Sequence, residues 1–155
     1  MRTIADLLSE HRFFADLDAA DRDVLAGCGR NVTVEPGTVM MREGQHADVF
    51  WAIRSGRVRV GITHPTRGLL DLETLEDGDI LGWSWLLPPH RWHFDAVTDS
   101  PVHAVAFDAT CLRAKCQLDP RLGFALVQRF ARVLDERLVA ARLRLLDLYG
   151  DPVHR

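Results

Sequence analysis

The stretch from residue 78 to residue 96, GDILGWSWLLPPHRWHFDA, gathers side chains that could bind a ligand. It holds three of the four tryptophans, two histidines, one arginine and a Pro-Pro pair. An indole ring could stack on a flat ligand and contribute about 1 kcal/mol, and a planar guanidinium suits a phosphate group. The candidate ligand-binding residues are Gly82, Trp83, Ser84, Trp85, His90, Arg91, Trp92 and His93.

The same residue types fit other chemistries less well, because their spacing is unsuitable. His90 and His93 lack a third metal ligand unless Asp95 folds back towards them, so we expect no metal site. A haem needs committed axial ligands, and the residues that qualify by type alone are His46, His90, His93 and Cys111. The sequence has no nucleophile elbow, no P-loop and no evident carboxylate pair, so we assign no catalytic residue and expect no enzyme.

The composition is typical of one globular domain. The chain has 155 residues, of which 47% are hydrophobic and 26% charged. Its formal net charge of −3 gives no electrostatic case for binding nucleic acid. No apolar run approaches the roughly 18 residues that span a bilayer, and acidic residues interrupt the apolar N-terminus. We therefore expect neither a membrane segment nor a signal peptide.

The cysteines predict a reduced, cytoplasmic protein. There are three of them, an odd number without CxxC spacing, so we expect no disulfide framework. Lys115 could lower the pKa of the adjacent Cys116 thiol. The simpler interpretation is that Cys111 and Cys116 are structural and half-buried on a short helix.

Two short helices are predicted before residue 30. Residues 3–6 have the spacing of a capping box, which favours a helix start at Thr3. Asp18 is placed to cap a second helix that buries Val24 and Leu25 and ends at Gly27 or Gly29.

From residue 31 the apolar period changes to two, which indicates strands. Short alternating runs are separated by turn sequences such as Pro36-Gly37, Ser55-Gly56 and Asp77-Gly78. About eight short strands imply a small antiparallel sandwich, roll or barrel. The predicted runs include 31–34, 39–42, 49–54, 58–62, 70–73, 93–98 and 102–107.

Two helices follow the last strand. Asp108 resembles the N-cap of a short helix that reaches about Cys116. Asp119-Pro120 is a strong start for a second helix, which should run to about Tyr149 and end at Gly150.

The long helix carries a heptad-spaced apolar seam. Its first two turns should pack on the β domain, whereas later turns of a helix roughly 45 Å long outrun a small body. The exposed seam then needs a partner, and we favour a parallel homodimer over packing within the chain. The seam is Phe124, Val127, Ala131, Leu134, Leu138, Ala141, Leu145 and Leu148, with the dimer contacts expected at Val127, Leu134, Leu138, Ala141 and Leu145.

The order of turns resembles the cyclic-nucleotide-binding domain of Crp/Fnr-type regulators. The matching segments are 34–39 (VEPGTV), 42–48 (REGQHAD), 50–58 (FWAIRSGRV) and 78–82 (GDILG). The resemblance implies an α+β, mainly β fold: a double-stranded β-helix, or jelly-roll-like β-roll, with short N-terminal helices and a long C-terminal dimerisation helix. It divides the chain into the roll with its flanking helices (1–118), the C-terminal helix (119–149) and a tail (150–155).

The resemblance also implies a phosphate-binding cassette, from which this sequence departs. The family has a glutamate after the glycine that corresponds to Gly82, to accept the ribose hydroxyl, whereas here Trp83 follows, and tryptophan accepts no hydrogen bond. By counting, His90 takes the place of the phosphate-binding arginine, with Arg91 one residue later. Each lost bond to a charged group costs about 1.5–3 kcal/mol. We therefore doubt that cAMP or cGMP binds tightly, and we assign no cofactor. The three tryptophans of this stretch either stack on a ligand or plug the pocket: they are Trp83, Trp85 and Trp92.

The family's regulators continue into a helix-turn-helix domain, and this sequence ends at Arg155. We therefore expect no direct DNA binding. Two interpretations stay open. One is a regulatory domain that senses a nucleotide or other small ligand and signals to a partner protein. The other is a ligand-free dimeric scaffold or accessory subunit with an aromatic-plugged pocket. A Crp/Fnr-type transcriptional regulator is the less favoured third.

Overall fold

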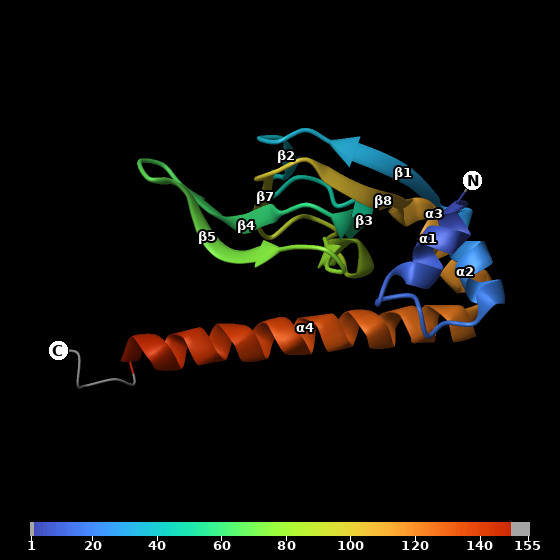
Figure 1. Ribbon diagram of the computed structural model, residues 1–155. Helices are drawn as coiled ribbons and strands as arrows, with labels where there is room; N and C mark the ends of the chain where they lie inside the picture. Colours follow the sequence, from blue (N-terminus) through green and yellow to red (C-terminus); the bar gives the residue numbers. More distant parts are fainter. Residues whose placement is uncertain (1, 150–155) are drawn as a thin grey trace.

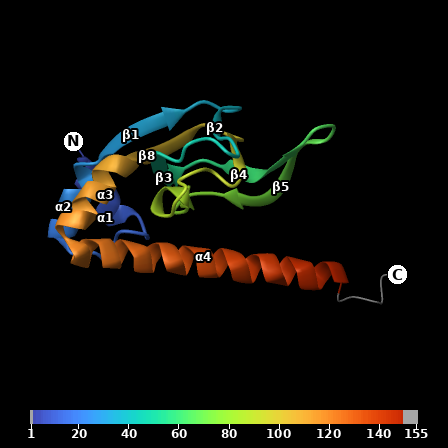
Figure 2. The same ribbon diagram turned by 180° about the vertical axis from the view of Figure 1, so that it is seen from behind.

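The computed structural model describes residues 2–149. A β-roll lies alongside the long helix α4, and the short helices α1, α2 and α3 gather at one end of the roll (Figure 1). Seen from behind, α4 runs beneath the whole roll, from the short helices to below the β4–β5 hairpin (Figure 2). The molecule is therefore a β-roll with a helical base.

The N-terminal helices begin where their capping residues predict. In α1 (Ile4–Glu10) the Thr3 hydroxyl accepts a bond from the Asp6 amide, and the Asp6 side chain accepts one from the Thr3 amide. Helix α2 (Ala19–Ala26) follows Asp18. The prediction that both Val24 and Leu25 are buried is wrong for Val24, which is 40% exposed, whereas Leu25 is 1% exposed. Successive helical residues point about 100° apart, so only one of this pair can face the core.

The strands form two four-stranded antiparallel sheets, which confirms the predicted roll. The first has the order β1-β8-β3-β6 and the second β2-β7-β4-β5. Strand β7 begins two residues later than expected, because His93 and Phe94 belong to the preceding loop. The strands are β1 (Gly29–Val34), β2 (Val39–Met41), β3 (Val49–Ser55), β4 (Val58–His64), β5 (Gly68–Leu75), β6 (Ile80–Leu81), β7 (Asp95–Thr98) and β8 (Val102–Asp108).

Strand β8 separates two hydrophobic cores. Val102 and Ala104 point into the roll, whereas Val105 and Phe107 point towards the helices, as the two-residue period of a strand requires. The roll interior includes Ile53, Val58 and Trp92, and the core beneath the helices is rich in aromatic rings. The helix-side rings are Phe13, Phe14, Phe50, Trp85, Phe107 and Phe130.

The C-terminal helices begin as predicted. Asp108 caps α3 (Ala109–Leu118) by accepting a hydrogen bond from the Cys111 amide at 2.8 Å. Helix α4 (Pro120–Tyr149) follows Asp119 directly. The predicted stop at Gly150 lies outside the described residues.

The face of α4 that packs on the rest of the domain is not the heptad seam. Leu122, Leu126 and Phe130 are each 1% exposed, whereas the seam residues Phe124 and Val127 are 64% and 51% exposed. The first two turns of α4 therefore pack on the domain as predicted, but through Leu122 and Leu126, and the expectation that the seam residues Phe124 and Val127 make this contact is wrong. The helix is apolar on two sides, and the body covers the side that the heptad count omits.

Cys111 and Cys116 are half-buried on α3 as predicted, whereas the prediction of no disulfide is wrong, because Cys28 and Cys111 form one. Their Cα atoms lie 5.6 Å apart although 83 positions separate them in sequence. Spacing along the chain cannot show this pairing, which arises because β1 and α3 both lie at the helical end of the roll. Cys116 is a free, half-buried thiol on α3.

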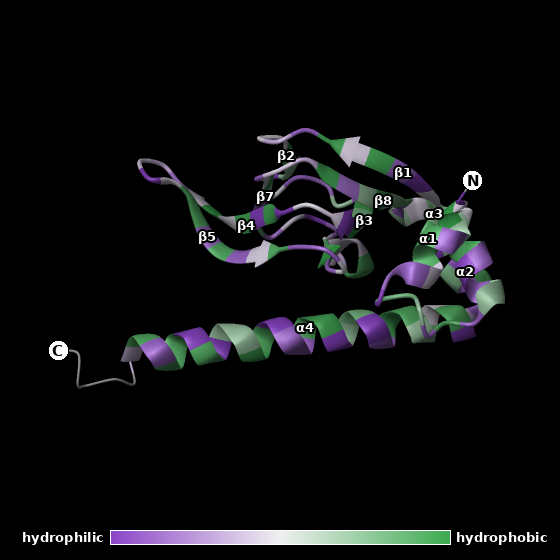
Figure 3. Ribbon diagram, in the orientation of Figure 1, coloured by the Kyte–Doolittle hydropathy of each residue, from purple (hydrophilic) through white to green (hydrophobic). Residues whose placement is uncertain are grey.

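Apolar and polar residues alternate along α4 (Figure 3). Among the described residues, no helix combines the length and the hydropathy required to cross a bilayer.

Candidate functional site

The cassette region begins with a glycine whose side chain has no room to grow. Gly82 follows β6 with φ of +90°, and a Cβ there would lie 2.9 Å from the Trp92 ring. Trp92 is 5% exposed and stacks on Trp51 with ring centroids 6.0 Å apart. The family turn is thus kept, and an indole packs against it.

The 3-10 helix η1 (Ser84–Leu86) follows Gly82. Trp83, just before it, and Trp85, within it, point in different directions. Trp85 is 1% exposed and packs in the helix-side core, 5.4 Å from Phe50 and 5.6 Å from Phe130 between ring centroids. Trp83 is half-buried and stacks on His93 at 5.0 Å with an interplanar angle of 19°. Trp85 therefore lies away from the cassette cavity, whereas Trp83 lines it.

The cavity at the cassette is nearly filled. Its volume is about 10 Å³, close to the least that holds one water molecule. Residues from both sheets and from α4 surround it. The lining is Met41, Val60, Glu73, Leu75, Leu81, Gly82, Trp83, Ser84, His93, Phe94 and Arg137.

His90 and Arg91 lie outside this cavity. The His90 carbonyl accepts a hydrogen bond from the Ala47 amide at 2.7 Å, and His90 has a positive φ of 57°. Arg91 is exposed and its guanidinium donates to the Gly44 carbonyl at 2.9 Å. The loop between Leu87 and Trp92 thus folds back on the turn between β2 and β3. Counting along the chain put His90, or Arg91 beside it, in the position of the phosphate-binding arginine, and the structure places neither residue at the cavity.

The arginine that reaches the cavity is Arg137, from the middle of α4. Its guanidinium donates to the Ile80 carbonyl, and its Nε lies 3.7 Å from the Glu73 carboxylate. The side chains of Arg137 and Glu73 are 19% and 23% exposed. Sequence reasoning missed Arg137. The available signal was the helical spacing 126, 130, 133, 137, which places it on the stripe that packs on the body.

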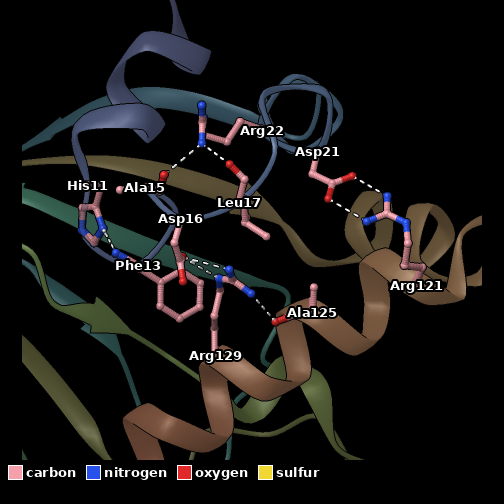
Figure 4. A network of polar contacts seen from close by, with 10 residues as sticks. All are labelled: His11, Phe13, Ala15, Asp16, Leu17, Asp21, Arg22, Arg121, Ala125 and Arg129. Carbon is pink, nitrogen blue, oxygen red and sulfur yellow. Dashed lines mark hydrogen bonds and ion pairs between the residues drawn. The ribbon is translucent and has the colours of Figure 1, made fainter.

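Ion pairs fix the first part of α4 to the N-terminal segment (Figure 4). Arg121 donates two hydrogen bonds to Asp21, at 3.0 and 2.7 Å, and Arg129 donates to Asp16 at 2.8 Å. These bonds hold the pKa of both carboxyls below the usual value for aspartate. The start of α4 is therefore anchored, and Arg137 is the next polar contact along it.

A buried histidine supports the same corner. The Nδ1 atom of His11 accepts a hydrogen bond from the Phe13 amide, and Nε2 lies 3.1 Å from the Ile53 carbonyl. Both bonds together require the neutral ring protonated on Nε2. Burial lowers the pKa of His11.

The architecture and the cassette position define a regulatory, ligand-binding type of β-roll. The family model described as "Cyclic nucleotide-binding domain" matches residues 31–119. The chain belongs to that family.

Solved structures share the fold. A cyclic nucleotide-binding domain from Methylobacillus flagellatus superposes with a TM-score of 0.79 at 18% identity, covering 97% of this chain and 84% of that one. The N-terminal domain of a transcriptional regulator from Streptomyces coelicolor gives 0.68 at 23%, covering 84% and 94%. A cAMP-binding acyltransferase from Mycobacterium smegmatis gives 0.69 at 28%, covering 88% of this chain and 41% of that one. No curated protein matches the sequence.

Proposed function

We propose that this chain is a homodimeric regulatory module whose cassette is closed by its own side chains and which acts without a bound cyclic nucleotide. The observation that carries the proposal is the cassette cavity of about 10 Å³. Pockets that enclose a small organic ligand have volumes of roughly 300–1,000 Å³. A nucleotide would have to displace several packed side chains before it could bind.

The chemistry of the site supports the same conclusion. Trp83 stands where the family carboxylate accepts the ribose hydroxyl, and Arg91 is bonded to Gly44 outside the cavity. The cation that lines the cavity, Arg137, already has the Ile80 carbonyl and the Glu73 carboxylate as partners. A phosphate would therefore have to compete with bonds that the protein itself makes.

The exposed seam of α4 supports the dimer. Val127, Leu138 and Leu145 are about half exposed, at 51%, 50% and 54%, and Ala141 is exposed between them, while Leu134 is half-buried. An apolar stripe of this length is normally covered by another helix. We propose that a second copy of α4 covers it and that a partner protein reads the resulting dimer.

Calorimetric titration with cAMP and cGMP tests the closed cassette. We expect a dissociation constant weaker than about 1 mM, equivalent to about −4 kcal/mol. The Mycobacterium smegmatis cAMP-binding acyltransferase, in the same buffer, is the positive control. Saturable binding of either nucleotide near about 10 μM or tighter would contradict the proposal.

Light scattering after size exclusion tests the dimer. We expect twice the chain mass for the wild type and the single mass for Leu138→Asp, which places a charge on the seam. Asp135→Ala, a change on the same helix off the seam, is the control and should stay dimeric. A monomeric wild type would refute the dimer.

A second candidate function is a sensor of a ligand other than cAMP or cGMP. One observation favours it: Trp83 is only half-buried and His93 is exposed, so their stack forms a movable cover at the cavity. In this case a ligand would displace the stack and Arg137, and α4 would shift. Hydrogen exchange across 80–94 and 130–149, with a panel of nucleotides, separates the two functions, because only a sensor shows ligand-dependent protection in both segments.

A further inference from the structure

The Cys28–Cys111 disulfide joins two segments that meet at the helical end of the roll. Cys28 lies in the turn between α2 and β1, and Cys111 lies in the first turn of α3. The helix α3 leads through Asp119 into α4. The bond therefore holds the start of the helical unit that carries the proposed dimer surface.

The disulfide borders an open hollow on the surface. The hollow has a volume of about 510 Å³, and its walls include Trp51, Asp48 and Arg30 beside both cysteines. Cys111 is half-buried and Cys28 is 7% exposed, so Cys111 is the more accessible partner. An external thiol can approach the bond from this side.

The fold around the bond has contacts that do not depend on it. The Asp108 amide donates to the Cys28 carbonyl at 2.9 Å, and the Ala109 amide donates to the Asp48 carbonyl at 3.0 Å. Ala109 and Leu112, on the inner face of α3, are fully buried. These contacts keep the two cysteines adjacent when the bond is broken, which allows it to form again.

We propose that Cys28 and Cys111 are a reversible redox site, reduced by a dithiol and oxidised by a hydroperoxide. In reduction, a thiolate of the dithiol attacks the Cys111 sulfur, the S–S bond breaks and Cys28 leaves as a thiolate that takes up a proton. The second thiol of the reductant then closes its own disulfide and releases Cys111. Two electrons and two protons pass from the dithiol to the protein.

Oxidation reverses this change. The Cys111 thiolate attacks the terminal peroxide oxygen, which gives a sulfenic acid on Cys111 and releases an alcohol, or water from hydrogen peroxide. The Cys28 thiol then attacks that sulfur, the S–S bond forms and water leaves. Cys111 is the more exposed of the two thiols, so it is the one that a peroxide reaches first.

The third cysteine provides an internal control. Cys116 lies at the other end of α3, where its side chain contacts Gly123 of α4. Burial raises the pKa of its thiol, which disfavours attack on a peroxide. Cys116 is thus a spectator in this scheme, and the redox site stands independently of the proposed dimer and the closed cassette.

The test is mass spectrometry of the alkylated full-length chain after treatment with dithiothreitol and then with one equivalent of hydrogen peroxide. We expect one alkylated cysteine before reduction and three after it, an unchanged far-ultraviolet circular dichroism spectrum, and return of the Cys28–Cys111 linkage with peroxide. Cys116→Ser should behave as the wild type, and Cys28→Ser should stop at a sulfenic acid on Cys111 that dimedone traps. Loss of the folded spectrum on reduction, resistance of the bond to dithiothreitol in the folded chain, or reoxidation to any other linkage would overturn the proposal.

Discussion

Replacing Arg137 by methionine should loosen the middle of α4 from the roll. Methionine keeps an unbranched stem of similar length but removes the charge, so the change isolates the polar contacts of the guanidinium. Those contacts are the bond to the Ile80 carbonyl and the 3.7 Å approach to the Glu73 carboxylate.

The size of the effect follows from these two contacts. A hydrogen bond from a charged donor contributes about 1.5–3 kcal/mol when it is shielded from water, and Arg137 is 19% exposed. The ion pair is long and partly solvated, so it adds less than about 1 kcal/mol. We expect Arg137→Met to lower the free energy of unfolding by about 2 kcal/mol, which corresponds to a fall of about 4–8 °C in Tm for a domain of this size.

The measurement is urea unfolding at a fixed protein concentration, because the proposed dimerisation would make stability depend on concentration. The control is Arg142→Met, an exposed arginine on the same helix, for which we expect a change within about 0.5 kcal/mol. Equal stability of the two variants would refute the role given to Arg137. A cycle with Glu73→Gln separates the carboxylate from the Ile80 carbonyl, since only the ion pair is shared by the two variants.

Three further predictions concern packing, pH and the cassette turn. Phe130→Ala should lower the free energy of unfolding by about 3–5 kcal/mol in urea, because the ring fills the core between α4 and the roll. His11→Gln should remove the loss of stability that the wild type shows as the pH falls from about 7.5 to about 5. The pKa of His11 is lower in the folded chain than in the unfolded chain, so its contribution to stability is complete above the unfolded value of about 6.5 and is lost as the pH falls below it. Urea unfolding across that range measures the change. Gly82→Ala should destabilise through both its positive φ and the clash with Trp92, which a thermal melt will detect.

Matched controls make each result interpretable. Phe124→Ala removes an exposed ring from the same helix and should change the unfolding of a monomeric background by less than about 1 kcal/mol. His64→Gln, in the β4–β5 hairpin, should keep the wild-type pH dependence. Gly37→Ala shares a positive φ, but nothing lies within 4 Å of the added Cβ, so its cost measures backbone strain alone. If Gly37→Ala lowered the stability as much as Gly82→Ala, the clash with Trp92 would contribute nothing to the cost of the Gly82 substitution.

Much of the fold could be predicted because its signals are local. Thr3, Asp108 and Asp119-Pro120 begin helices through bonds to residues a few positions away. The glycine turns also act locally, since Gly37 and Gly82 adopt the positive φ that a turn requires. These short-range rules are enough to place most of the strands along the chain, whereas the roll and the position of the cassette were implied by the resemblance of the turns to a known family.

The site was harder to predict because its contacts join distant segments. The Cys28–Cys111 disulfide and the Arg137–Glu73 ion pair each join residues that are far apart in the sequence, and no rule on residue spacing predicts such pairs. The directions of Trp83 and Trp85 depend on how η1 sits between two cores. On α4, a heptad count selected one apolar stripe, and the roll packs on the other.

The 3-10 helix η1 connects the cassette to the core beneath the helices. Trp83, which precedes η1, lines the cavity, and Trp85, within η1, packs against Phe130 of α4. The Trp85 carbonyl also accepts a hydrogen bond from Arg113 of α3 at 2.9 Å. Because Trp83 and Trp85 lie two residues apart on the same short turn, a backbone movement of η1 that shifts Trp83 also shifts Trp85 and its contacts with α3 and α4.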